Sequence, residues 1–263
     1  MLSRGDGRRA GLTLIELLML LGMFLFLLGF LLPAVFRLRQ IGGQTSSRNN
    51  MMQMVLAMHN VNDAQRLLPP TVGEFPPKSN TQGTFHFYLL PYIEQENVYR
   101  LAEGSVWKNG TYSKRIPVFV NAQDKSAPPN GQFEGWLATT SYAANWLVFK
   151  QGGASLPRSF PDGTSNSIVL AERYQVCNGV PTGWGYASIY SWAPKFAYYS
   201  KAKFQMMPAQ EDCRPGLAQA TQRHGIMVAL GDGSVRTVGD AVSPQTWAYA
   251  CDPADGNPLG NDW

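Results

Sequence analysis

Residues 11–35 read GLTLIELLMLLGMFLFLLGFLLPAV, and this stretch decides how the whole chain is organised. Between residues 12 and 35 it contains a single charged residue, Glu16. A helix of this length rises about 36 Å, at about 1.5 Å per residue, which is enough to cross the hydrocarbon core of a bilayer. Helices in soluble cores are rarely apolar on every face for so long. The sequence therefore predicts a transmembrane helix over residues 12–35.

Three interpretations of this helix compete. A cleaved signal peptide needs a shorter apolar region and a cleavage site of the small-x-small type, and residues 29–40, GFLLPAVFRLRQ, contain no good site. A plain signal anchor fits the length but gives no reason for Glu16, because a carboxylate inside an apolar segment is costly and usually has a partner. The third interpretation is a helix that is processed at its start and pairs with other copies, which gives Glu16 a role.

The third interpretation is favoured because residues 11–18, GLTLIELL, resemble the processing motif of type IV prepilins and type II secretion pseudopilins. The resemblance implies that a prepilin peptidase cuts after Gly11 and methylates the new N-terminus at Leu12, where the family most often has phenylalanine or methionine. It also implies that Glu16 pairs with the terminal ammonium of a neighbouring subunit, since a charge created in lipid needs a counter-ion. Pro33 falls where pilins carry a helix-kinking proline.

On this interpretation the chain has four parts. Residues 1–11 are a basic leader, residues 12–35 the transmembrane stalk helix, residues 36–68 the second half of the stalk, and residues 69–263 an extracytoplasmic head. Arginines flank the helix on both sides, so the positive-inside rule orients it only weakly. The resemblance to prepilins is what places the leader in the cytoplasm and the head outside it.

The second half of the stalk has a helical pattern with a weak point near its start. Gly42-Gly43 disfavours an unbroken helix, and Ser47 or Asn49 is suited to cap a restart. An apolar stripe with helical spacing follows, formed by Met51, Met54, Val55 and Met58. We expect this stripe to pack on the sheet of the head, and Pro69-Pro70 to end the helix.

Beyond the stalk the sequence predicts an α+β head. Residues 85–90, FHFYLL, are a strand or another buried segment, and residues 91–104 contain a short helix. Residues 167–172 follow the turn PDGT and predict a strand. Residues 226–238 predict a hairpin, because two apolar segments flank the turn GDG. The expected fold class is pilin-like α+β, a long transmembrane stalk helix followed by a globular head with a mainly antiparallel β-sheet.

Several blocks along the chain carry a second resemblance. They are residues 49–60, which begin with Asn-Asn and end with His-Asn, LLPYIEQ at residues 89–95, TSYAAN at 140–145, FPDGTSNSI at 160–168, and residues 223–235, which begin with RH and end with GDGSV. In this order they are similar to a large bacterial family catalogued as domain-of-unknown-function family 1559, best known from planctomycetes. Its members typically begin with the prepilin motif, so the resemblance implies the same pilin-like architecture. It implies little about function.

Charge and motifs argue against two classes of function. The net charge is +4, and about +2 of it comes from Arg4, Arg8 and Arg9 against Asp6 in the leader. No basic stripe follows that would suit nucleic acid. No nucleophile elbow, zinc-binding helix, phosphate-binding loop or dinucleotide fingerprint occurs. We therefore expect neither nucleic-acid binding nor an enzyme.

Three cysteines, Cys177, Cys213 and Cys251, lie far apart without a metal-binding or redox pair motif. In an extracytoplasmic head they allow one disulfide and one free thiol, and the sequence does not choose among the three pairings or against three buried thiols.

The C-terminal loop offers a candidate metal site. Oxygen-bearing side chains and glycines are dense there, and calcium favours six to eight oxygen ligands from such a flexible segment. The loop loosely resembles the calcium loop of the major type II secretion pseudopilin, but it lacks the spacing of an EF-hand. The candidate ligands are Asp252, Asp255, Asn257 and Asp262.

These observations predict a structural subunit of the bacterial cytoplasmic membrane, with its head in the periplasm or at the cell surface. Its expected partners are a prepilin peptidase, the lipid bilayer and other pilin-like subunits, which it would join through its N-terminal helix. The alternative is an anchored module that does not polymerise and binds a glycan, peptide or cell-wall ligand. That alternative rests on the aromatic content of the head, including Trp136, Trp146, Trp184 and Trp192, which would otherwise be core residues.

Overall fold

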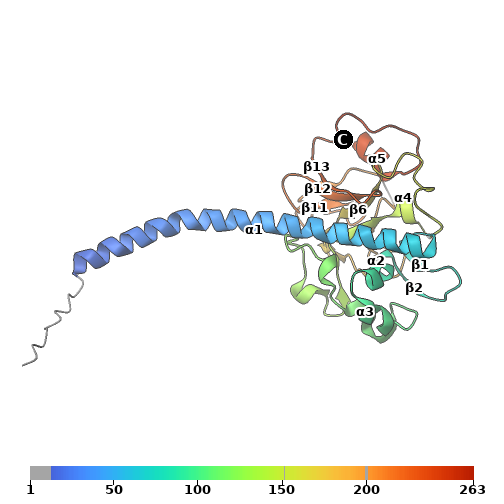
Figure 1. The fold of residues 1–263 in the computed structure, drawn as a ribbon, viewed down its shortest axis with the longest axis horizontal. Helices are drawn as coiled ribbons and strands as arrows, with labels where there is room; N and C mark the ends of the chain where they lie inside the picture. The colour runs from blue at the N-terminus through green and yellow to red at the C-terminus, as the bar shows by residue number, and fades with distance from the viewer. Residues whose placement is uncertain (1–12, 151, 199–200) are drawn as a thin grey trace, which may run out of the picture. The chain divides into compact units, whose positions relative to one another are not determined.

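A computed structural model describes residues 13–150, 152–198 and 201–263, with side chains throughout except at residues 30–41. The chain divides into two compact units, Met1–Gly42 and Gly43–Trp263. We call the second unit the head. One helix, α1, runs from Leu14 to Gln65 and belongs to both units (Figure 1). The boundary between the units falls within residues 36–68, the part predicted as the second half of the stalk.

The expected break and restart of the helix near Gly42-Gly43 does not occur, because α1 is helical throughout this region. Two glycines disfavour a helix by about 2 kcal/mol relative to alanine. Burial of the following turns in the head offsets that cost. Ser47 is not a cap, since its side chain instead contacts the Tyr142 hydroxyl at 2.8 Å. The helix ends at Gln65, before Pro69-Pro70 as predicted.

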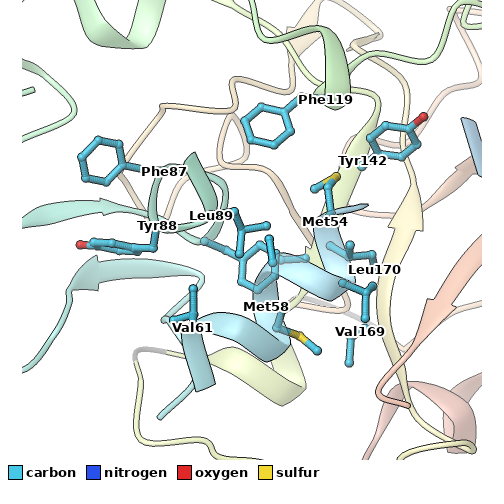
Figure 2. Close-up of a cluster of buried hydrophobic side chains, with 14 of the residues drawn as sticks. Met54, Met58, Val61, Phe87, Tyr88, Leu89, Phe119, Tyr142, Val169 and Leu170 are labelled. Carbon is cyan, nitrogen blue, oxygen red and sulfur yellow. The ribbon is translucent and has the colours of Figure 1, made fainter. Parts of the chain in front are cut away.

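The apolar stripe of α1 forms part of the larger core of the head, as its spacing predicts. Met51, Met54, Val55 and Met58 have no solvent exposure. They belong to the same cluster as side chains of α2 (Phe85–Leu89) and β6 (Ile168–Glu172). Figure 2 shows Met54 and Met58 lying toward these elements. Full burial of such a side chain contributes about 1.5–3 kcal/mol.

A five-stranded sheet lies at the centre of the head, in the order β13-β12-β6-β5-β9. Its other strands are β5 (Tyr142–Asn145), β9 (Lys195–Phe196), β12 (Ile226–Leu230) and β13 (Val235–Val238). The pairs β13–β12, β12–β6 and β6–β5 are antiparallel, and the pair β5–β9 is parallel. The hairpin predicted over residues 226–238 and the strand predicted over residues 167–172 are both present.

Both faces of the sheet are covered. Along β12, Met227 and Ala229 face the larger core, which contains α1, whereas Ile226 and Val228 face a second core. This alternation follows from the two-residue period of a strand. The second core contains Trp247 of α5 (Pro244–Cys251). The head therefore has a layer on each side of the sheet.

Short elements complete the head. The remaining α-helices are α3 (Glu96–Leu101) and α4 (Trp146–Phe149). Four further strand pairs lie outside the main sheet: β1 (Val72–Glu74) with β2 (Gln82–Thr84), β3 (Gln132–Phe133) with β4 (Leu137–Ala138), β7 (Val176–Cys177) with β8 (Val180–Pro181), and β10 (Gln205–Met206) with β11 (Gln219–Ala220). Within the described residues, the 3₁₀ helices are η1 (Leu90–Tyr92), η2 (Lys108–Ser113), η3 (Pro117–Phe119) and η4 (Pro129–Gly131).

The fold is α+β, and its main sheet is mixed: three of the four strand pairs are antiparallel, and β9 joins β5 in parallel at the edge of the sheet. The part of the predicted fold class that is wrong is the transmembrane stalk helix. Among the described residues, none of the helices is both long enough and apolar enough to cross a membrane. The prediction gave residues 12–35 as the transmembrane half of a stalk that continues through residues 36–68, and in the structure one helix, α1, runs through both parts from Leu14 to Gln65.

The segment Phe85–Leu89 is buried as expected, but it forms the helix α2 and not a strand. Thr84 caps it, because its hydroxyl accepts a hydrogen bond from the Phe87 amide at 3.2 Å. The short helix predicted within residues 91–104 is α3.

Candidate functional site

The first turns of α1 expose their apolar side chains to solvent. We call Leu14–Leu27 the apolar segment. Its large side chains are each between 50% and 77% exposed: Leu14, Ile15, Leu17, Leu18, Met19, Leu20, Leu21, Met23, Phe24, Leu25, Phe26 and Leu27. Contiguous exposed apolar surface of this kind marks a site of interaction with a partner or with lipid.

Glu16 has a partner within its own helix. The amide and the hydroxyl of Thr13 both donate to Glu16 Oε2 at 2.9 Å, and the Glu16 amide donates back to Thr13 Oγ1 at 3.4 Å. This arrangement is a capping box, which satisfies amides that the start of a helix would otherwise leave without acceptors. Sequence reasoning assigned Glu16 to a neighbouring subunit only and missed this local role, although the spacing Thr-x-x-Glu signals it.

Three further residues with predicted roles in processing or assembly have no described side chain. Gly11 and Leu12 lie outside the described residues. Pro33 lies in the part of α1 whose side chains are not described, although the helix is continuous through it. Their roles stay predictions.

A buried polar cluster joins α1 to the sheet. Ser47 of α1 contacts the hydroxyl of Tyr142 on β5, and its own hydroxyl donates to Glu172 on β6 at 3.5 Å. Asn121 Nδ2 and Thr221 Oγ1 donate to the same carboxylate oxygen at 2.9 and 3.0 Å. The other oxygen, Oε2, accepts from the amides of Thr221 and Met227 at 3.4 and 3.2 Å. The cluster thus connects five segments that are far apart in the sequence.

The carboxyl group of Glu172 has no solvent exposure, and burial raises its pKa to about 7, although hydrogen bonds from Met227 and Thr221 act in the opposite direction. Sequence reasoning missed this residue. The one available signal is a glutamate at the end of the apolar strand β6.

A second carboxylate, that of Asp124, is buried nearby. It accepts hydrogen bonds from the Ser126 hydroxyl at 2.5 Å, the Ser141 hydroxyl at 3.0 Å and the Gln175 amide at 3.0 Å. Burial raises the pKa of Asp124, and its negative charge also raises that of Glu172. The head therefore places two acidic groups in its interior, where each is held by neutral donors.

Because the pKa of Glu172 rises from 4.5 to about 7 on folding, the folded state binds its proton more tightly than the unfolded state does. The stabilising effect of that proton is complete below about pH 4.5 and is lost as pH rises through about 7. Glu172→Gln removes this titration. Between pH 5 and pH 8 we expect the free energy of unfolding of the original chain to fall by about 2 kcal/mol relative to that of the variant.

Urea denaturation of both chains at several pH values measures this difference. The comparison is needed because burial lowers the pKa of His86 to about 3, so this histidine destabilises the fold as pH falls below about 6.5 in both chains. Parallel pH curves for the two chains would show that Glu172 does not titrate in this range.

The structure selects one cysteine pairing. Cys177 and Cys213 form a disulfide, with Cα atoms 5.4 Å apart, and Cys251 is a buried free thiol. The bond ties β7 to the loop that follows β10, 36 residues further along the chain. Disulfides persist mainly in oxidising compartments.

The four predicted calcium ligands have separate local partners. Asp252 pairs with Lys201 Nζ at 2.6 Å, and Asp255 Oδ1 accepts from the Asn257 amide at 2.9 Å. Asp262 accepts from the Thr246 hydroxyl at 2.6 Å and the Ser243 amide at 2.7 Å, at the start of α5. Within the described ranges, no group of three or more histidine, cysteine, aspartate or glutamate side chains is placed to hold a metal ion. Calcium binding stays a prediction from the sequence.

The four tryptophans on which the alternative function rests lie in three different surroundings. Trp184 is fully buried, and its indole nitrogen donates to the Lys114 carbonyl at 2.8 Å, so it is a core residue. Trp146, half-buried, packs on Tyr198. Trp136 and Trp192 belong to a closed circuit of rings with centroids 5.3 to 6.0 Å apart, which we call the aromatic circuit. Its members are Trp107, Tyr112, Trp136, Trp192 and Tyr186.

Together these features define a class of protein: an α+β head built around the second half of a long helix whose first turns expose an apolar segment. Residues 38–109 match the model of a family described as "Protein of unknown function (DUF1559)". The match confirms, for this segment of the chain, the family resemblance drawn from the sequence. No curated protein and no solved structure matches the chain.

Proposed function

We propose that the chain is a pilin-like structural subunit that assembles through α1 into a filament of the type IV pilus or type II secretion kind. One observation carries the proposal: a single helix exposes apolar side chains over Leu14–Leu27 and is buried in the core of the head from Met51 onward. Such a helix is covered at one end by its own chain and requires a partner at the other. Copies of the same chain supply that partner.

Self-association of this kind favours an open polymer. If the apolar segment of one copy packs on a different surface of the next, the contact is heterologous, and heterologous contacts that do not close into a ring generate helical filaments. The apolar side chains would then leave water at about 25 cal/mol per Å² of buried surface. The proposal includes no enzymatic activity and no nucleic-acid partner.

Processing belongs to the same proposal. A prepilin peptidase would cut after Gly11 and methylate Leu12, as the resemblance of residues 11–18 implies. Cleavage there leaves the Thr13 amide intact, so the capping box with Glu16 survives in the processed chain. As the resemblance implies, the negative charge of Glu16 would then pair with the new terminal ammonium of a neighbouring copy.

The proposed location is the bacterial cytoplasmic membrane before assembly, with the head in the periplasm or at the cell surface. The disulfide between Cys177 and Cys213 supports an oxidising environment for the head. The apolar segment supports association with lipid or with other subunits.

The intact mass and the N-terminal sequence of the protein from its native source test the proposal. We expect a chain that begins at methylated Leu12, together with pilin-like chains that co-purify after crosslinking. A chain that still begins at Met1 in cells with an active prepilin peptidase would overturn the processing. A processed chain that crosslinks to no other copy would overturn the assembly.

Glu16→Gln separates the two roles of this residue. Glutamine serves in a capping box as glutamate does, so helix content should be unchanged. The charge that would meet a neighbour's ammonium is lost, and we expect filament yield to fall by at least tenfold. Circular dichroism and electron microscopy measure the two effects.

Thr13→Val is the matched control, because it weakens the capping box and leaves the charge of Glu16. Filaments of Glu16→Gln at normal yield would show that the charge is not needed.

One observation favours a second candidate function, an anchored module that binds a glycan, peptide or cell-wall ligand and does not polymerise. The aromatic circuit lies at the surface, where Trp107 is 39% exposed, and Tyr190 is exposed in the loop that leads to Trp192. Aromatic rings that are partly exposed offer large, rigid contact area to a ligand.

Titration of the full chain with peptidoglycan fragments, followed by tryptophan fluorescence, tests this function. Saturable quenching in a chain that stays monomeric would favour it over the filament.

A further inference from the structure

The outer face of α1 within the head carries two exposed apolar side chains. Met52 is 47% exposed and Leu56 is 62% exposed, although Met51, Met54 and Val55 beside them in the sequence are fully buried. The helix therefore has one face in the core and a second apolar face toward solvent. Its exposed residues lie one turn apart on that face.

Leu56 separates two hollows in the surface of the head. The first has a volume of about 490 Å³ and lies between α1 and the turn that joins β12 to β13. The second has a volume of about 350 Å³ and lies between α1 and the segments around Tyr92 and Val118. Gln53 and Leu56 line both hollows, so we treat the two as one feature and call it the groove. Its volume is within the range of ligand sites.

The charge of the groove is negative. Asp63 and Asp232 line the first hollow, and Glu94 lines the second. The lining residues of both hollows include neither lysine nor arginine, and in the described ranges none of these three carboxylates takes part in an ion pair. Asp232 Oδ1 accepts from the Ser234 amide at 2.9 Å and the Ser234 hydroxyl at 2.7 Å, which holds the turn and leaves Oδ2 for a ligand.

His59 also lines the first hollow. Its Nε2–H donates a hydrogen bond to the Gly231 carbonyl oxygen at 3.0 Å. This bond attaches α1 to the same turn that carries Asp232. The acidic side chains and the apolar residues of α1 are therefore held in one rigid surface.

We propose that the groove binds a short peptide segment in which lysine or arginine side chains adjoin apolar ones. The apolar side chains would cover Met52 and Leu56, and the cationic groups would meet Asp63, Asp232 and Glu94. Acidic ligands are disfavoured by the same three carboxylates. The apolar segment of a second copy, Leu14–Leu27, is a poorer occupant, because the one charged side chain within it is the acid Glu16, and none of its own side chains is cationic.

Methionine methyl NMR on the full chain tests this proposal with an internal control. Met52 lines the groove, Met19 and Met23 lie in the apolar segment, and Met58 is buried. The probe is an acetylated six-residue peptide of alternating leucine and lysine. We expect the Met52 methyl to shift with saturation, while Met58 stays unchanged. Shifts at Met19 and Met23 with none at Met52 would place the peptide on the apolar segment and overturn the proposal.

Two matched peptides separate the contributions of charge and apolar contact. A peptide of alternating leucine and glutamate keeps the apolar side chains and reverses the charge, and one of alternating serine and lysine keeps only the charge. We expect each to bind at least tenfold more weakly than the leucine–lysine peptide. Equal binding of the leucine–glutamate peptide would show that the carboxylates do not select the ligand.

Variants in the groove complete the test. Asp63→Asn together with Asp232→Asn changes exposed side chains only, so folding is retained, and we expect about tenfold weaker binding at low salt. Asp212→Asn together with Glu134→Gln is the matched control, because both are exposed acidic residues outside the groove. Equal losses in the two double variants would show a general charge effect and would overturn the site.

Discussion

A chain that begins at Arg66 is expected to be unfolded, whereas a chain that begins at Gly43 is expected to fold. The difference is the second half of α1, which places five apolar side chains larger than alanine in the larger core of the head. They are Met51, Met54, Val55, Met58 and Val61, each at most 1% exposed. Burial of each contributes about 1.5–3 kcal/mol, so together they account for about 7–15 kcal/mol. That sum is as large as the whole stability of a typical domain.

The cut at Gly43 follows the boundary between the two units and keeps every one of these contacts. It also keeps Ser47, whose hydroxyl reaches Tyr142 and Glu172. Near-ultraviolet circular dichroism and urea denaturation of the two fragments measure the outcome. Met54→Ala in the fragment 43–263 is the graded control, with an expected loss of about 2–5 kcal/mol. A cooperative unfolding transition in the fragment 66–263 would contradict the assignment of α1 to the core.

The second large effect is expected from the disulfide. Replacing Cys177 and Cys213 by alanine, or reducing the bond, should lower the free energy of unfolding by about 4 kcal/mol. The reason is that a bond between residues 36 apart removes many conformations from the unfolded chain. Urea denaturation with and without dithiothreitol measures the loss.

Two comparisons make this experiment specific. The double alanine variant should no longer respond to dithiothreitol. Cys251→Ala removes the buried free thiol and leaves the disulfide in place, so its response to the reductant should match that of the original chain. Equal stability of the original chain with and without reductant would show that the bond contributes nothing to the fold.

The fragment and disulfide experiments bear on the proposed function, because α1 has one role in assembly and another in the stability of the head. Its first turns expose the surface proposed for assembly, and its later turns stabilise the head. A substitution that destabilises the head would therefore lower filament yield even where the assembly surface is intact. Measuring the stability of the head beside filament yield separates the two causes for any variant.

Several features of the chain were predictable from local sequence. The apolar segment, the methionine stripe and the hairpin of β12 and β13 were all found, because each shows its own periodicity or turn within a few residues. The family resemblance came from short blocks of sequence, and the segment that matches the family model, residues 38–109, contains the block LLPYIEQ. The capping box of Thr13 and Glu16 was equally local in the sequence. It was missed because Glu16 was interpreted only as a charge that needs a partner in another subunit.

Other features depended on distant contacts. The aromatic segment Phe85–Leu89 has the composition of a strand, yet it is a helix because Thr84 caps it and the core covers it on all sides. Strand β9 has only two residues, so nothing in its sequence indicates parallel pairing at the edge of the sheet. The pair Gly42-Gly43 predicted a break in the stalk, and only the structure shows that α1 passes through these glycines without interruption.

By itself, then, the sequence determined where the chain is helical near its start, which face of that helix enters a core, and which family residues 38–109 resemble. The tertiary structure decided the pairing of Cys177 with Cys213, the burial of Glu172 and the shape of the groove around Leu56. Each of these joins segments that lie tens to more than a hundred residues apart. Local periodicity reports on neighbours a few positions along the chain, and such contacts arise only when the folded chain brings remote segments together.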